Sequence, residues 1–157
     1  MKTADVVHDA LASLAGETAT VVVFVANGCP TARAYTDRLI ALHREWAPRG
    51  VNIIAVNSNN ASLSPADTEA EMARRHFPFP YLKDAGAALA RSLDARVTPH
   101  AFVLDRDMAV VYSGRIDDSR LGDKITTRDL NDAIAAVVQG RPVPSSHTEP
   151  FGCSIVW

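Results

Sequence analysis

The sequence predicts an α/β fold with three layers, in which helices cover both faces of a central, mixed β-sheet. Two apolar runs, at residues 18–26 and 51–57, are rich in β-branched side chains, as in parallel strands buried on both faces. Segments with apolar residues at helical spacing lie between and around them. A hairpin pattern at residues 101–113 adds an antiparallel strand pair, so we expect strands of both directions.

The length of 157 residues suits one domain, and we expect residues 1–157 to form it, with the proline-containing residues 141–157 as an extended C-terminal tail. A net charge of −2 gives no electrostatic reason to expect nucleic acid or a membrane surface as a partner. No apolar run approaches the roughly 20 residues of a membrane-spanning helix. Residues 1–9 lack the apolar centre of a signal peptide, so we expect a cytoplasmic protein.

The N-terminal half predicts two helices around the first strand. Residues 4–14 carry apolar side chains at helical spacing and are followed by Gly16, a helix stop. These apolar positions are Ala4, Val7, Leu11 and Leu14. After the strand at 18–26, Pro30 suits the first position of a helix, where its missing N–H costs nothing. Apolar residues at three-four spacing continue this helix to about Trp46.

The segment after residues 51–57 predicts an inserted helix and a short strand. Residues 64–67, Ser-Pro-Ala-Asp, have the N-cap, the N1 proline and the acidic N3 residue of a helix start. The expected inner side of this helix carries Met72, Ala73 and His76. Two prolines within residues 77–82 suit an extended segment at the edge of the sheet.

Three further elements are predicted in the C-terminal half. Asp84 is expected to cap a short helix that carries two leucines. The charged residues 115–124 predict a surface loop. Thr126 and Asp129 form a capping pair for a last amphipathic helix, which glycine and proline end.

The two cysteines, Cys29 and Cys153, lie far apart in the chain. The histidines form no ligand-like spacing with them, so we expect neither a metal nor another cofactor. Cys29 stands between the end of the first strand and Pro30, at the start of a helix, where the helix dipole favours the thiolate. This position favours a reactive thiol over an inert buried one.

Four segments together carry a family resemblance. They are residues 27–35 (Asn-Gly-Cys-Pro-Thr-Ala-Arg-Ala-Tyr), 77–82 (Phe-Pro-Phe-Pro-Tyr-Leu), 114–118 (Gly-Arg-Ile-Asp-Asp) and 150–157 (Pro-Phe-Gly-Cys-Ser-Ile-Val-Trp). The chain resembles thioredoxin-like proteins of the peroxiredoxin-like branch (AhpC/TSA, or redoxin), in particular a bacterial group with an Asn-x-Cys-Pro motif and a Pro-Phe-Gly-Cys-Ser-Ile-x-Trp end. The resemblance implies a thioredoxin-like fold, with a helix and strand inserted before the strand that starts after a cis-proline.

The resemblance also implies a thiol redox function, either thiol-disulfide exchange or a peroxidase-like reaction. Ala32 stands where a Cys-x-x-Cys motif has its second thiol, and Ala26 stands where peroxiredoxins have a threonine. Cys29 is therefore expected to act as a single nucleophile that forms a sulfenic acid or a mixed disulfide. We hypothesise that the tail brings Cys153 to resolve it, the alternative being that Cys153 is an inert apolar residue.

Five residues are expected to support the thiol: Asn27, Pro30, Arg33, Thr98 and Pro99. Asn27 shapes the turn, and Arg33 either assists the thiolate or an anionic substrate or is a solvated surface residue. Pro99 resembles the cis-proline that faces the active cysteine, which would let the Thr98 backbone pair with a peptide.

The expected partners are a disulfide or peroxide substrate and a reductant, either a low-molecular-weight thiol or a reducing protein, with the chain as a monomer or homodimer. Two other classes of function remain open at this point. One is a non-catalytic module that binds a peptide beside Pro99. The other is a Cu(I)-handling protein that uses Cys29, Cys153 and His100, because soft thiolates select Cu(I).

Overall fold

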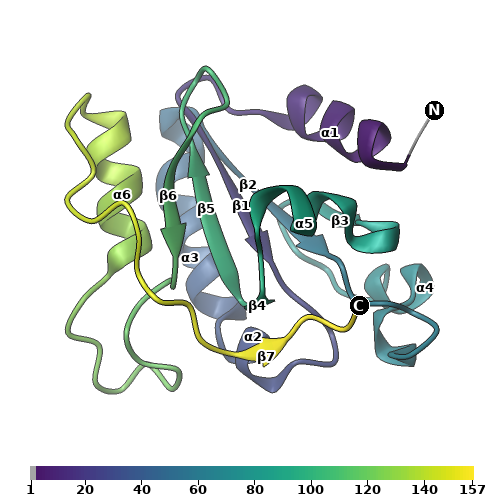
Figure 1. The fold of residues 1–157 in the computed structure, drawn as a ribbon. Helices are drawn as coiled ribbons and strands as arrows, with labels where there is room; N and C mark the ends of the chain where they lie inside the picture. The colour runs from purple at the N-terminus through teal and green to yellow at the C-terminus, as the bar shows by residue number, and fades with distance from the viewer. Residues whose placement is uncertain (1–2) are drawn as a thin grey trace.

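The computed structural model describes residues 3–157 and contains a five-stranded sheet with the strand order β3-β2-β1-β5-β6 (Figure 1). The strands are β1 (Ala19–Phe24), β2 (Val51–Asn57), β3 (Tyr81–Lys83), β5 (His100–Leu104) and β6 (Val110–Gly114). β1, β2 and β3 are parallel, whereas β5 is antiparallel to both of its neighbours. The prediction of a mixed sheet with an edge strand near residues 77–82 is confirmed.

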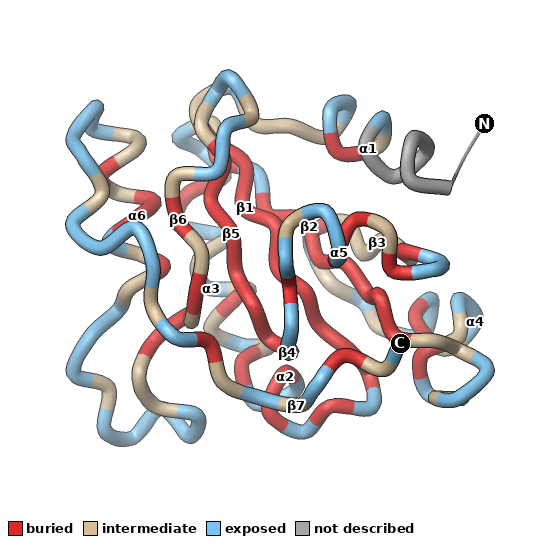
Figure 2. The backbone as a smooth tube through the Cα atoms, in the orientation of Figure 1, coloured by how far each residue is buried: buried red, intermediate tan, exposed pale blue. Residues whose placement is uncertain are grey.

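Helices cover both faces of this sheet, as predicted. α2 (Pro30–Ala34), α3 (Thr36–Trp46) and α6 (Asp129–Val138) pack on one face. α1 (Thr3–Leu14) and α5 (Ala88–Leu93) pack on the other. β1 is buried along its whole length (Figure 2), and its side chains alternate between the two cores. The side chains of Ala4 and Val7, predicted for the inner face of α1, lie outside the described residues, whereas Leu11 is buried.

The helix predicted from Pro30 to Trp46 is divided in two at Tyr35. The backbone N–H of Tyr35 bonds to the Ala32 carbonyl 3.1 Å away, which closes α2 with a tight three-residue turn before α3 begins. The Tyr35 hydroxyl donates to the Asp117 carboxylate at 2.9 Å, and the Arg38 guanidinium lies 3.7 Å above the Tyr35 ring centre. These contacts hold the junction between the two helices in place.

The start predicted for the inserted helix is correct only for a 3₁₀ helix at Pro65–Asp67, for which Ser64 is the N-cap residue. The Ser64 hydroxyl does not cap a helix but donates to the Asp67 carboxylate at 2.5 Å, within a single 3₁₀ turn. The α-helix α4 (Glu69–Met72) begins later and is capped by Thr68, which accepts from the Glu71 N–H. Met72, the last residue of α4, is buried as predicted. Ala73 and His76, also predicted for the inner side, are exposed.

The predicted capping pair of the last helix is wrong. Asp129 forms an ion pair with Arg115, with its carboxylate 2.7 Å from the Arg115 Nε, and no side chain caps α6. Thr126 instead hydrogen-bonds to Asp118. The loop at 115–124 is only partly a surface loop, because Ile116 and Asp117 are buried.

The cap predicted for α5 is confirmed. The Asp84 carboxylate accepts from the backbone N–H groups of Leu89 and Ala90, at 3.1 and 3.0 Å.

The C-terminal tail runs across the end of the sheet at which β1 finishes (Figure 1). Its strand β7 (Cys153–Ser154) pairs antiparallel with β4 (Val97–Thr98), the two residues that precede Pro99. Ile155 anchors the tail in the core beneath α1 and α5, with 3% of its surface exposed. Among the described residues, no helix combines the length and apolar character needed to cross a bilayer.

Candidate active site

Cys29 is the N-cap residue of α2 and is almost completely buried, with 1% of its surface exposed. Its sulfur accepts a hydrogen bond from the Ala32 N–H at 3.3 Å, and its thiol donates to the Thr98 carbonyl at 3.2 Å. Pro30 is the first residue of α2, as predicted, and has no N–H to leave unpaired there. The strand, the turn and the helix start therefore hold the thiol in one orientation.

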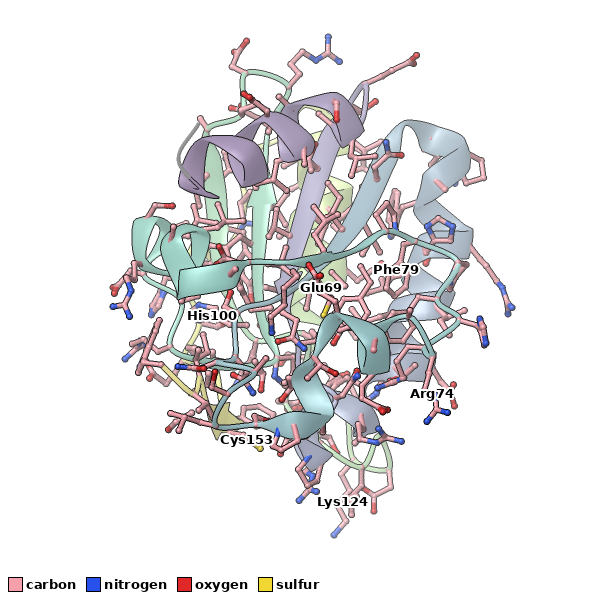
Figure 3. All side chains as sticks on the ribbon, turned by 90° about the vertical axis from the view of Figure 1, so that its right-hand side faces the viewer. Glu69, Arg74, Phe79, His100, Lys124 and Cys153 are labelled. Atoms are coloured by element: carbon pink, nitrogen blue, oxygen red, sulfur yellow. The ribbon has the colours of Figure 1, made fainter. Side chains whose placement is uncertain are left out.

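Cys153 lies next to Cys29, although the two cysteines are distant in sequence. Thr98 is the register partner of Cys153 in the β4–β7 pair, and its carbonyl is the group to which Cys29 donates. The two side chains lie close enough for each to shift the pKa of the other, and both thiols are free. Figure 3 shows Cys153 toward the lower edge of the molecule.

The two thiols differ in acidity. Burial raises the pKa of Cys29, but hydrogen bonds from the Cys153 thiol, Thr98 and the Ala32 N–H outweigh it and lower the pKa below the usual 9.0. Burial raises the pKa of Cys153, and the hydrogen bond to Cys29 raises it further. Cys29 is therefore the thiol that ionises first, with Cys153 as its hydrogen-bond donor.

Gly152 lets the tail approach the Thr98–Pro99 segment closely. A Cβ atom on Gly152 would lie 1.9 Å from the Thr98 carbonyl oxygen and 3.3 Å from Cδ of Pro99. The backbone φ of Gly152 is +153°, a value that side chains disfavour. Only glycine allows β7 to pair with β4 at this distance, and so to bring Cys153 to Cys29.

The Thr98–Pro99 peptide bond is cis. The Thr98 side chain is buried, and its hydroxyl has no hydrogen-bond partner while the Cys29 thiol donates to the Thr98 carbonyl. The same side chain lowers the pKa of Cys29, although its hydroxyl forms no hydrogen bond to the protonated sulfur among the described residues. The unpaired hydroxyl is thus a donor available to the thiolate.

Asn27 organises the turn before Cys29 and does not contact the thiol. Its N–H donates to the Asp67 carboxylate at 2.7 Å, and its side-chain N–H donates to the Ala66 carbonyl at 3.0 Å. Its side-chain oxygen accepts from Arg75 and from the Tyr81 hydroxyl. Asn27 therefore shapes the turn, as expected.

Asp67 is a site residue that the sequence reasoning missed. Its buried carboxylate accepts from Asn27, Gly28, Asn57, Asn59 and Ser64. Burial raises the pKa of Asp67, but these donors outweigh it and hold the pKa below 3.8. The polar residues after β2 were the available signal, because sites in open α/β sheets gather at the carboxyl ends of strands.

Arg33 is exposed and lies on the rim of the site, where its guanidinium donates to the Asn27 carbonyl at 3.2 Å. His100 is not directed at the thiols. One of its ring nitrogens hydrogen-bonds to the Arg96 N–H and the other to the Ser113 hydroxyl. Burial lowers its pKa to about 4. The third ligand expected for a Cu(I) site is therefore not brought to the cysteines, and the described residues contain no metal-binding group of three or more acidic, histidine or cysteine side chains.

Comparison with known proteins gives one family and close structural relatives. A family model described as Redoxin matches residues 4–134, whereas no curated protein matches significantly. An uncharacterized conserved protein from Geobacillus kaustophilus is 36% identical, with a TM-score of 0.86 over 94% of this chain and 81% of that one. A hypothetical protein from Sinorhizobium meliloti 1021 is 35% identical, with a TM-score of 0.83 over 94% and 84%. A thioredoxin-like protein solved in its oxidized form, 17% identical, has a TM-score of 0.62 over 82% of each chain and the same fold.

Proposed function

The chain belongs to the Redoxin family, and from this we propose that it is a thiol-disulfide oxidoreductase in which Cys29 attacks and Cys153 resolves. The observation that carries the proposal is the β4–β7 pairing, which places Cys153 opposite Thr98, the residue whose carbonyl accepts from Cys29. The pKa values of the two thiols are shifted in opposite directions. A more acidic thiol beside a less acidic one is the arrangement that separates an attacking from a resolving cysteine. Cys153 takes the role that a second cysteine at Ala32 would have in a Cys-x-x-Cys motif.

In the proposed reaction, the Cys29 thiolate attacks one sulfur of a substrate disulfide. The bond between Cys29 and this sulfur forms as the substrate S–S bond breaks, and the first substrate thiolate leaves and takes up a proton. Cys153 then gives up its proton and attacks the Cys29 sulfur, and the second substrate thiol leaves with that proton. The substrate gains two electrons and the protein becomes the Cys29–Cys153 disulfide. A low-molecular-weight thiol or a reducing protein returns the two electrons.

A hydroperoxide would use the same two thiols. The Cys29 thiolate would attack the terminal oxygen, the O–O bond would break and an alcohol would leave, giving a sulfenic acid. Attack by Cys153 would then release water and form the same disulfide. We favour the disulfide substrate because Ala26 has no hydroxyl at the position where peroxiredoxins have a threonine.

Peptide mapping after oxidation tests the pairing of the two cysteines. Reduced protein is treated with one equivalent of 2-hydroxyethyl disulfide, free thiols are alkylated, and the digest is analysed by mass spectrometry. We expect a linked Cys29–Cys153 peptide in the monomer, and in Cys153→Ser a mixed disulfide on Cys29 only. Two free cysteines after oxidation, or a linkage only between molecules, would contradict the proposal.

The Thr98 hydroxyl is expected to stabilise the thiolate, so Thr98→Val should raise the pKa of Cys29. Because only the thiolate reacts with iodoacetamide, the alkylation rate rises with pH through this pKa. The wild-type midpoint should lie below 9.0 and the Thr98→Val midpoint above that of the wild type. Thr98→Ser, which keeps the hydroxyl, is the matched control and should retain the wild-type midpoint. If the Thr98→Val and Thr98→Ser variants had equal midpoints, the Thr98 hydroxyl would not stabilise the thiolate.

A further inference from the structure

Two arginines beside the turn before Cys29 have no acidic partner among the described ion pairs. The Arg75 guanidinium donates to the side-chain oxygen of Asn27 at 3.2 Å and to the Thr36 hydroxyl at 3.3 Å. Arg33 donates to the Asn27 carbonyl. All three acceptors are neutral, so the positive charge of both arginines is hydrogen-bonded but not neutralised.

The two guanidiniums also act on each other. Burial lowers the pKa of Arg75, and the nearby charge of Arg33 lowers it further. The buried carboxylate of Asp67 forms none of the described ion pairs and accepts instead from Asn27, Asn57 and Asn59. Like charges held together without a counter-ion are stabilised by an anion that binds both.

Arg75 is held in an orientation suited to binding. Its guanidinium lies 4.7 Å above the centre of the Phe77 ring, in addition to its bonds to Asn27 and Thr36. A guanidinium has five N–H donors, and these two bonds leave others free. A planar group fixed in this way binds a carboxylate through two parallel hydrogen bonds at low entropic cost.

These arginines line a narrow cleft whose walls include two residues that hydrogen-bond to Cys29. The cleft is bordered by Arg33, Thr36, Arg75, Phe79, Ala26 and Ala32. The Ala26 carbonyl accepts from the Cys29 N–H at 3.3 Å, and the Ala32 N–H donates to the Cys29 sulfur. Figure 3 views the side of the molecule on which α4 and the segment to Phe79 lie nearest the reader. The cleft itself, at about 10 Å³, has room for about one water molecule, so a larger anion would bind at its mouth, where Arg33 is exposed.

We propose that Arg75 and Arg33 form a subsite for a carboxylate group of the low-molecular-weight disulfide that reacts with Cys29. This rests on the proposed function and adds the substrate class: small disulfides with a carboxylate near the sulfur, in preference to neutral or cationic ones. Arg75, preorganised and half-buried, supplies the paired hydrogen bonds. Arg33, on the exposed rim, supplies a second positive charge.

The test compares three small disulfides that differ in charge. Reduced protein is mixed with 3,3′-dithiodipropionate, 2-hydroxyethyl disulfide or cystamine, and each rate constant is divided by that of a neutral small thiol with the same disulfide. We expect the normalised rate of the wild type to be at least about 10-fold higher for the anionic than for the neutral disulfide, and lowest for cystamine. The Arg33→Gln, Arg75→Gln double variant should lose most of this ratio. Arg74→Gln, which removes an exposed arginine paired with Glu71, should retain it.

The carboxylate subsite would be contradicted if the wild type reacted equally well with all three disulfides, or if the double variant kept the preference for the anionic one. Neither result would contradict the proposed function. If none of the three disulfides reacts with Cys29, the proposed function fails. In that case a titration with suberate, a dicarboxylate without sulfur, still decides the subsite. Binding followed by NMR of the arginine Nε–H signals should be present in the wild type and lost in the double variant. If suberate did not bind to the wild type, the carboxylate subsite would be contradicted.

Discussion

Replacing Cys29 by serine should lower the rate constant for reduction of a small disulfide by about 10³-fold or more, close to the rate in buffer. A serine hydroxyl is not ionised near neutral pH, so the nucleophile is lost. Cys153 should not take over, because burial and the contact with Cys29 raise its pKa. The measurement is the second-order rate constant from the release of a chromophoric thiol by the reduced protein.

Cys153→Ser is the matched variant for this experiment. It keeps the attacking thiol, so it should release about one equivalent of substrate thiol and then stop until a reductant is added. If Cys29→Ser stayed within 10-fold of the wild type, or if Cys153→Ser abolished the first release, the assignment of the attacking thiol would be wrong.

Gly152→Ala should separate the two thiols and slow formation of the Cys29–Cys153 disulfide by about 10-fold or more, because the tail would lose the close placement that makes the step intramolecular. The added Cβ would lie 1.9 Å from the Thr98 carbonyl oxygen, so β7 could not keep its pairing with β4. Cys29 should also become more accessible, since the tail lies next to it. We expect faster alkylation of Cys29 when each rate is divided by the fraction of thiolate, because loss of the Cys153 contact should also raise the pKa of Cys29.

Gly140→Ala serves as the control for the backbone effect. Gly140 has a positive φ of +68°, and a Cβ there would meet nothing within 4 Å. The substitution should cost about 1 kcal/mol of stability or somewhat more, and leave the rate of disulfide formation unchanged. Wild-type disulfide kinetics in Gly152→Ala would show that tail docking does not bring the thiols together.

Local patterns were sufficient for most of the fold. β1 and β2 follow from apolar runs with side chains for two buried faces, and α5 follows from the Asp84 cap. Two capping predictions failed because a polar side chain had two possible partners. Asp67 suited an N-terminal helix position, but its carboxylate accepts instead from the backbone N–H of Asn27 and the side-chain amides of Asn57 and Asn59. Asp129 likewise forms an ion pair with Arg115 and does not cap α6.

The sequence by itself determined the attacking half of the candidate site. Cys29 directly follows the segment after the first strand and directly precedes Pro30. Its position at the start of a helix therefore depends only on neighbouring residues. Only the tertiary structure decided what surrounds the sulfur. The contacts of Thr98, Cys153 and Arg75 with this region join residues tens of positions apart, and they depend on Gly152 fitting against the Thr98 carbonyl and on the packing around Asn27. Periodicity describes which face of an element is buried, whereas such contacts depend on how separate elements meet.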